Sequence, residues 1–189
     1  DAHGTTQFST ATRWNNEFAF GVVNFEDLTG PNTLRVFGDP SYGEGSHVIV
    51  NDIAKVISSE KEWMVIDSED KFHCISCTAA TKSLIPTGVS GKSVKDAWTN
   101  AADPGLTCVL FQDGTVESWG YTNTDSKVPT RLTDTPGIVA DVVQFMYGYC
   151  AILSDSTVEC WGDNTKNSLN VPSGLSGVTQ LYGVKWNLL

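Results

Sequence analysis

A short proline-containing phrase returns at a fixed interval through this 189-residue chain. It reads Ile-Pro-Thr-Gly-Val-Ser-Gly at 85–91, Val-Pro-Thr-Arg-Leu at 128–132 and Val-Pro-Ser-Gly-Leu-Ser-Gly at 171–177, so its prolines lie 43 residues apart. A second phrase, Asp-Gly-Thr-Val-Glu-Ser-Trp-Gly at 113–120, returns as Asp-Ser-Thr-Val-Glu-Cys-Trp-Gly at 155–162. Self-similarity with a period of about forty residues is the signature of a repeat architecture. The chain is therefore expected to fold as a series of similar units.

Each repeat is predicted to consist of short β-strands. An Asp-Gly turn between two apolar runs is the strongest short-range signal for a hairpin. Hairpins are predicted at 18–38, 63–75, 108–119 and 150–161. Entry strands are predicted at 53–57, 94–98, 139–145 and 178–182. No segment of eleven or more residues has helical periodicity, so we predict an all-β chain.

The predicted strands are apolar on both faces. Val116 and Trp119 lie three positions apart in one strand, so their side chains face opposite sides of the sheet. A sheet that is apolar on both faces must be covered on both. Radially stacked blades satisfy this requirement, and a single β-propeller domain over residues 1–189, with antiparallel blades of about 40 residues, is the predicted fold. The expected repeats are 10–52, 53–93, 94–138, 139–177 and a partial repeat at 178–189.

The period also makes specific predictions about equivalent residues. Trp119 and Trp161 are expected at equivalent buried positions, and Pro86, Pro129 and Pro172 in equivalent linkers. Roughly four and a half repeats are present, so we expect an incomplete propeller or a fragment of a larger one. Either residues 1–10 pair with the strand that ends at Leu189, or the natural chain continues beyond it.

Composition narrows the range of partners. The net charge of −10 argues against nucleic acid, because phosphate binding needs clustered Lys and Arg. No window approaches eighteen consecutive apolar residues, so no insertion into a membrane is expected. The chain opens at Asp1 without Met, and we expect an N-terminal segment to have been removed or omitted. The cellular compartment stays open.

One family shares these motifs. The segments 148–153, 155–164 and 170–178 resemble the repeat of the regulator of chromosome condensation family, and above all its short-repeat bacterial branch, which includes the propeller-type β-lactamase inhibitory protein. The resemblance is strong over 94–189, fair over 53–93 and weak over 1–52. It implies a propeller, usually seven-bladed, that binds proteins through loops on one face. The family's nucleotide-exchange activity is not implied, because none of its functional loop residues can be matched here.

The sequence departs from that family in two ways. The usual His before the second strand is replaced by Trp63, Thr107, Tyr149 and Trp186, and the repeats are too few to close a seven-bladed ring. The replaced positions have two readings: aromatic side chains in the core, or exposed aromatic side chains that bind a partner.

Chemical motifs are sparse. Gly88–Ser93 lacks the glycine and the following helix that a phosphate-binding loop requires, so nucleotide binding is not expected. Cys74 and Cys77 have the spacing of half a zinc site, but no second pair completes it. Five cysteines fit no complete disulfide framework, and we interpret them as small apolar thiols, with Cys108 equivalent to Cys150 and Cys74 to Cys160. We therefore predict no metal, no cofactor and no catalytic residue.

Surface recognition is the remaining function. Six Trp residues are many for a chain of this size, and Trp and Tyr are enriched among the residues that dominate protein interfaces. The candidate protein-binding residues are Trp63, Tyr121, Tyr149, Asp163 and Trp186. We predict a non-enzymatic protein-interaction module, with a basic or mixed-charge protein partner, serving as a linker or subunit of a large complex. The alternative is a carbohydrate-binding propeller, which would repeat one pocket in each blade; an enzyme is the third hypothesis.

Overall fold

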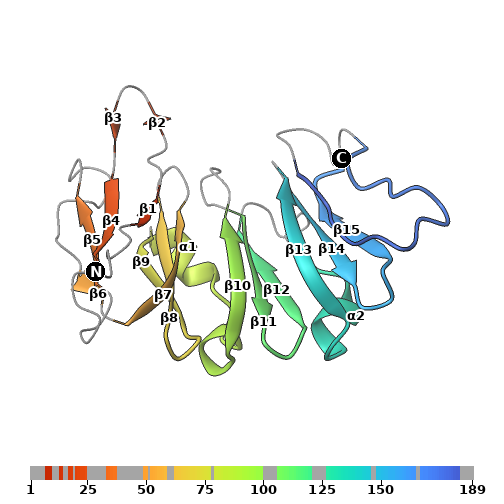
Figure 1. Ribbon diagram of the computed structural model, residues 1–189, viewed down its shortest axis with the longest axis horizontal. Helices are drawn as coiled ribbons and strands as arrows, with labels where there is room; N and C mark the ends of the chain where they lie inside the picture. The colour runs from red at the N-terminus through yellow and green to blue at the C-terminus, as the bar shows by residue number, and fades with distance from the viewer. Residues whose placement is uncertain are drawn as a thin grey trace, which may run out of the picture. The chain divides into compact units, whose positions relative to one another are not determined.

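The computed structural model describes residues 52–58, 62–77, 79–99, 106–120, 127–145, 148–164 and 167–183, together with the strands within residues 7–50 (Figure 1). The chain divides into two compact units, residues 1–82 and 83–189. It is mostly β, with antiparallel sheets and few, short helices. None of the described helices has the length and apolar character needed to cross a lipid bilayer.

The first unit contains three antiparallel sheets. Four strands pair in the order β1 (Gln7–Ser9), β4 (Phe20–Asn24), β5 (Thr33–Phe37) and β6 (Ile49–Val50). The short strands β2 (Arg13–Trp14) and β3 (Glu17–Phe18) pair with each other. The third sheet consists of β7 (Ile53–Ser58), β8 (Trp63–Asp67) and β9 (Phe72–Ser76), and α1 (Ala79–Leu84) follows it. The hairpins predicted at 18–38 and 63–75 are thus confirmed as β4–β5 and β8–β9.

The second unit contains two three-stranded sheets that share one plan. The first consists of β10 (Val94–Thr99), β11 (Thr107–Phe111) and β12 (Val116–Trp119), and the short 3-10 helix η2 (Val89–Gly91) precedes it. The second consists of β13 (Val139–Phe145), β14 (Gly148–Leu153) and β15 (Val158–Gly162), and α2 (Thr130–Asp134) precedes it. The predicted hairpins and entry strands at these places are confirmed.

The sheets β7–β9, β10–β12 and β13–β15 repeat the same irregularities. The pairing of each entry strand with the next strand shifts register after its first residue, at Ile53, Val94 and Val139. Each hairpin turn has a residue with positive φ at the same place, namely Asp70, Gly114 and Ser156. A bulge and a left-handed turn residue at matching positions show that the sequence period is a structural period.

The linker prolines are equivalent, as predicted. The carbonyl oxygens of Pro86, Pro129 and Pro172 each accept a hydrogen bond from the backbone N–H three residues later, over 3.0, 2.8 and 3.2 Å. Proline suits this place because its fixed φ favours the start of a turn or helix.

A continuous core joins the two sheets of the second unit. It includes Cys108 and Leu110 of β11, Leu132 of α2, and Tyr149 and Trp161 of the β13–β15 sheet. Both Trp119 and Trp161 are buried, which confirms the prediction of equivalent core positions. The two sheets therefore pack face to face, and the linker helix α2 closes one end of their contact (Figure 1).

The structure corrects the sequence prediction in two places. Two short helices, at 79–84 and 130–134, depart from the predicted all-β chain. The entry strand predicted at 178–182 is wrong, because no strand is assigned there. The equivalent strands β10 and β13 owe their pairing to the strands that follow them, β11 and β14. Residues 178–182 have no such partner among the described residues.

Candidate functional site

Two of the predicted binding aromatics are buried. Trp63 and Tyr149 lie near the start of the equivalent strands β8 and β14 and expose 3% and 0% of their surface. Thr107, at the start of β11, is also buried. For Trp63 and Tyr149, this burial favours the interpretation that they are aromatic side chains of the core over the interpretation that they are exposed and bind a partner.

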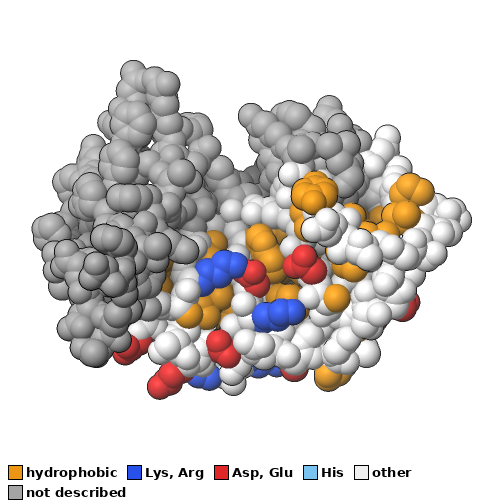
Figure 2. All heavy atoms as spheres, viewed as in Figure 1, with side chains coloured by type: hydrophobic (Ala, Val, Ile, Leu, Met, Phe, Trp, Pro, Cys, Tyr) orange, Lys and Arg blue, Asp and Glu red, His pale blue; other side chains and the backbone are white. Residues whose placement is uncertain are grey.

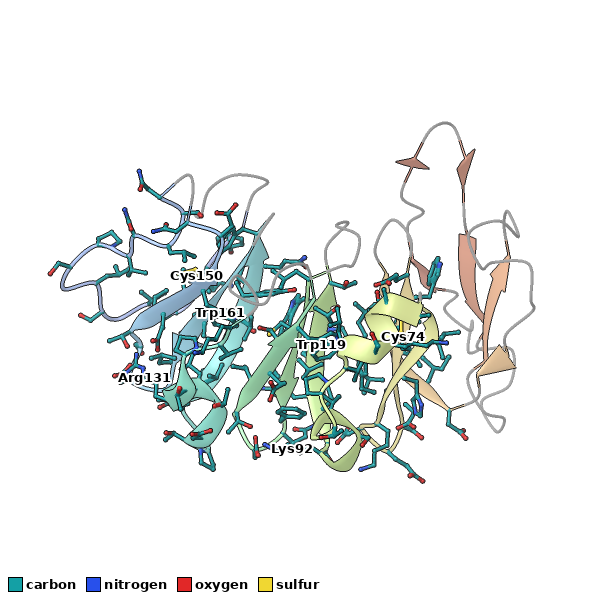
Figure 3. The ribbon with its side chains drawn as sticks, turned by 180° about the vertical axis from the view of Figure 1, so that it is seen from behind. Cys74, Lys92, Trp119, Arg131, Cys150 and Trp161 are labelled. Atoms are coloured by element: carbon teal, nitrogen blue, oxygen red, sulfur yellow. A yellow bond between two sulfur atoms is a disulfide. The ribbon has the colours of Figure 1, made fainter. Side chains whose placement is uncertain are left out.

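Tyr149 connects the two sheets of the second unit. Its hydroxyl donates a hydrogen bond to the carbonyl oxygen of Leu106 at 2.5 Å, and its ring centroid lies 5.7 Å from that of Trp161. The Trp161 Nε1–H in turn donates to the Ser118 Oγ at 3.2 Å (Figure 3). Burial raises the pKa of Tyr149 far above its usual value, so the phenol stays protonated and keeps its donor.

Asp163 lies in a compact loop after β15. Its carbonyl oxygen accepts a hydrogen bond from the Ser168 hydroxyl at 2.8 Å, and the Asn164 side chain accepts one from the backbone N–H of Leu169 at 3.0 Å. Asp163 is half-buried. The other two candidates, Tyr121 and Trp186, lie outside the described residues.

The interpretation of the cysteines as free thiols is wrong for four of them. Disulfides join Cys74 to Cys77 and Cys150 to Cys160, and only Cys108 is a free, buried thiol. The predicted equivalences hold in the strand register. Cys108 in β11 and Cys150 in β14 occupy the same place, but Cys108 lies opposite Ser118, whereas Cys150 lies opposite a second cysteine, Cys160. The signal was available in the sequence, because Cys150 and Cys160 are equidistant from the hairpin turn at Asp155.

A charged pair lies at the tip of the β11–β12 hairpin. The Asp113 carboxylate accepts hydrogen bonds from the Thr115 hydroxyl at 2.6 Å and from the Lys92 ammonium at 3.1 Å. Partial burial raises the pKa of Asp113, but the hydrogen bonds from Thr115 and Lys92 outweigh it and leave that pKa below its usual value. Across the described residues, no three His, Cys, Asp or Glu side chains gather in a way that would hold a metal ion.

The most distinctive surface follows β15. Residues 167–183, here called the uncharged segment, contain no Asp, Glu, Lys, Arg or His. Leu175 and Tyr182 expose 40% and 61% of their surface, and Val178 and Leu181 are half-buried. Figure 2 shows apolar side chains among uncharged surface at the upper right, where the segment lies, whereas blue and red charges cluster near the centre of the view. These exposed apolar side chains make the uncharged segment a candidate interaction surface.

Three apolar residues of the uncharged segment, Leu175, Val178 and Leu181, have buried equivalents one repeat earlier. Leu175 stands three residues after Pro172, as Leu132 does after Pro129, and the Val178 N–H donates to Ser156 as the Val139 N–H does to Gly114. By the same register, Leu181 corresponds to Val142. The three equivalents are almost inaccessible, with exposures of 0%, 4% and 2% for Leu132, Val139 and Val142. The uncharged segment therefore matches the start of a repeat, and these three positions are less buried in it than in the repeat before.

Sequence reasoning did not single out this surface. The sequence analysis considered aromatic residues in the loops and interpreted residues 171–177 only as a linker. The signal that would have found it is the run of seventeen residues without charge in a chain in which 18% of residues are charged.

No family model matches the chain, and no curated protein matches it. Solved structures do. The CRINKLY WD40 ectodomain of the Arabidopsis thaliana receptor kinase ACR4 is 16% identical, with a TM-score of 0.58 over 97% of this chain and 67% of that one. Human WBSCR16 is 12% identical, with a TM-score of 0.59 over 98% of this chain and 58% of that one, so the chain spans little more than half of its length. At these identities the likeness shows the fold alone, and the first of these neighbours is a WD40 domain, which supports a β-propeller fold.

Proposed function

We propose that this chain is a non-enzymatic protein-binding module: one propeller domain with repeats of the regulator of chromosome condensation type, acting as a scaffold or accessory subunit of a larger assembly. The observation that carries the proposal is the uncharged segment, which presents Leu175 and Tyr182 to solvent. Tyrosine in an apolar surrounding is typical of the centre of protein interfaces. Asp163 adjoins the segment in the sequence, and Tyr121 and Trp186 remain candidates for the same surface by their sequence positions.

The irregularity of the repeats supports a protein partner over a sugar. A lectin propeller would offer the same exposed aromatic in each blade, but Trp63, Thr107 and Tyr149 differ in kind and are all buried. A surface that occurs in one repeat alone suits one asymmetric partner.

The proposal is tested by co-purification with the full-length chain, identification of the partner by mass spectrometry, and calorimetry with the purified partner. The double variant Leu175→Ser and Tyr182→Ala should weaken binding by on the order of 2–4 kcal/mol with little change in Tm, because both side chains are exposed in the free protein. The matched control is Leu84→Ser, which removes a leucine of similar exposure, 37%, from another surface. Equal binding by the double variant and the control would refute the proposed surface. If the chain turns over a substrate, and one acidic substitution abolishes this turnover, an enzymatic function would replace the proposal.

A further inference from the structure

The disulfide between Cys74 and Cys77 lies in the first unit, at the point where β9 ends, and the proposed function does not use it. Cys74 belongs to β9, whereas Cys77 follows Ser76, the last residue of that strand. The two cysteines are three residues apart in the sequence, and their Cα atoms lie 5.7 Å apart, a separation that a disulfide spans (Figure 3). A Cys-x-x-Cys pair thus forms a closed bond at a strand end.

A β-bulge places both sulfurs on one face of the sheet. Residues three apart in a regular strand point to opposite faces. In its pairing with β8, β9 has one extra residue, Ile75, between Cys74 and Ser76, and this turns Cys77 back to the face of Cys74. The equivalent pairings of β11 with β12 and of β14 with β15 show no such shift. The bulge therefore accompanies the disulfide, and bulges are frequent beside functional sites because they redirect a side chain.

The second disulfide of the chain provides an internal comparison. Cys150 and Cys160 lie directly opposite in paired strands, with further residue pairs on both sides, so strand pairing keeps their sulfurs together with or without the bond. No pairing of the described strands includes Cys77, because β9 has already ended. The shorter loop also constrains the unfolded chain less, since the bonded cysteines are 3 residues apart in one disulfide and 10 in the other. The Cys74–Cys77 bond is therefore the more easily reduced of the two.

The local fold has an attachment that does not depend on this bond. Thr81 of α1 is fully buried, and its hydroxyl donates a hydrogen bond to the Glu62 carboxylate, which is also buried. This contact ties α1 to the residue before β8 whether the two cysteines are bonded or not. Cys74 and Cys77 are both half-buried, so a small thiol can reach their sulfurs while the chain stays folded.

We propose that Cys74 and Cys77 form a reversible redox site that exchanges with low-molecular-weight thiols and their disulfides, and that Cys150–Cys160 is the structural disulfide. A small thiol, reacting as its thiolate, bonds to one sulfur of the Cys74–Cys77 pair and expels the other, which takes up a proton. A second small thiol attacks the resulting mixed disulfide, leaves as the small-molecule disulfide and frees the remaining cysteine sulfur, which is protonated in turn. Two electrons and two protons have then passed from the small thiols to the protein, and a small-molecule disulfide reverses both steps. The site is separate from the uncharged segment, so it does not depend on the proposed binding function.

Redox titration of the full-length chain tests the proposal. The oxidised chain is equilibrated with mixtures of reduced and oxidised dithiothreitol, the exchange is stopped with acid, and alkylation in denaturant followed by peptide mass spectrometry gives the reduced fraction of each pair. Cys74–Cys77 should become half-reduced at a ratio of reduced to oxidised reagent at least tenfold lower than Cys150–Cys160 requires. In a parallel alkylation without denaturant, the buried free thiol of Cys108 reports unfolding, because it reacts only when the chain opens. Reduction of both pairs at the same ratio, or reaction of Cys108 together with Cys74 and Cys77, would overturn the proposal.

Single-cysteine variants test the mixed disulfide itself. Cys77→Ser leaves Cys74 as a thiol that should take up one glutathione from oxidised glutathione, detected by mass spectrometry of the peptide. The matched control is Cys160→Ser, because the Cys150 that it leaves is inaccessible in the folded chain and should react at least tenfold more slowly. Circular dichroism checks that both variants are folded, and the titration of the unmodified chain depends on neither. Equal rates of adduct formation in the two folded variants, or no adduct on Cys74, would contradict an exchange site at this place.

Discussion

Two side chains, Tyr149 and Trp161, link the β13–β15 sheet to the β10–β12 sheet through both packing and hydrogen bonds. Tyr149 reaches Leu106 and Trp161 reaches Ser118, so each carries a polar group into the core and satisfies it on the neighbouring sheet. A buried polar group that loses its partner is costly, whereas a paired one fixes the relative position of the two surfaces. These residues are therefore expected to determine stability and not recognition.

Tyr149→Phe should lower the free energy of unfolding by about 1–3 kcal/mol, because it leaves the Leu106 carbonyl without its hydroxyl donor while the ring stays in place. Urea unfolding of the purified chain measures the change. Tyr182→Phe is the matched control, since its hydroxyl donates to the exposed Gln180 side chain, and it should be nearly neutral. Equal stabilities of the two variants would mean that the inter-sheet hydrogen bond contributes nothing.

Trp161→Ala should destabilise the chain by about 3–5 kcal/mol, because it opens a cavity in the core between the two sheets. Trp161→Phe should retain most of that stability and lose mainly the hydrogen bond to Ser118. Near-native stability of the alanine variant would place Trp161 outside the core and contradict the packing of the sheets.

Asp113 should show a depressed pKa that rises when its donors are removed. Because the folded pKa lies below the unfolded value, the ionised carboxylate stabilises the fold above the unfolded pKa, and this contribution is lost as the pH falls through the folded pKa. Thr115→Val removes the hydroxyl that donates at 2.6 Å, so the Asp113 pKa should move upward toward 3.8 and the loss of stability should begin at a higher pH. NMR titration of the carboxyl carbon in both proteins measures this shift, and an unchanged titration would contradict the assignment.

At the scale of the element, the hairpin tip forms part of the contact between successive repeats. Gly114 accepts the Val139 N–H at 3.0 Å, and a Cβ on Gly114 would lie 2.8 Å from the Cα of Gly137. The tip of one sheet thus fixes where the next entry strand begins, and glycine is needed both for the left-handed φ of +76° and for the close approach.

Gly114→Ala should therefore destabilise the chain more than Gly174→Ala does. Both glycines have similar positive φ, +76° and +79°, so each substitution should cost about 1–2 kcal/mol from backbone strain. Only Gly114 adds a clash, because nothing lies within 4 Å of the Cβ position at Gly174. Chemical denaturation of both variants gives the difference, and equal losses would show that the hairpin tip yields to the added methyl group.

The hairpins and linkers were predictable because they depend on local signals. Asp113-Gly114 and Asp155-Ser156 set turns at equivalent places, and a proline sets each linker. The predicted strand at 178–182 failed because a strand depends on its partner as well as on its own residues, and the described residues hold none for it. The disulfides were missed because a count of cysteines ignores strand register, which is what brings Cys150 opposite Cys160. Trp63 and Tyr149 were ambiguous for a similar reason, since burial is set by the neighbouring elements.

At the scale of the whole molecule, the chain carries a net charge of −10, whereas the proposed binding surface contains no charged residue. Long-range charge affects the rate of encounter, and local apolar contacts affect the lifetime of the complex. Added salt screens the former much more than the latter, since the Debye length falls from about 30 Å at 0.01 M to about 3 Å at 1 M.

For a basic partner identified by co-purification, the association rate constant should fall by about tenfold between low and high salt, while the dissociation rate constant changes little. Stopped-flow measurements at several salt concentrations give both constants.

Asp163→Asn, close to the uncharged segment in the sequence, should slow association modestly at low salt and make no difference at high salt. Glu69→Gln is the control, because it removes the same charge from an exposed residue elsewhere. Association of the chain with itself should respond in the opposite direction, because screening relieves repulsion between two copies of charge −10. A partner whose association is accelerated by salt would therefore be acidic, and the predicted basic or mixed-charge partner would be wrong.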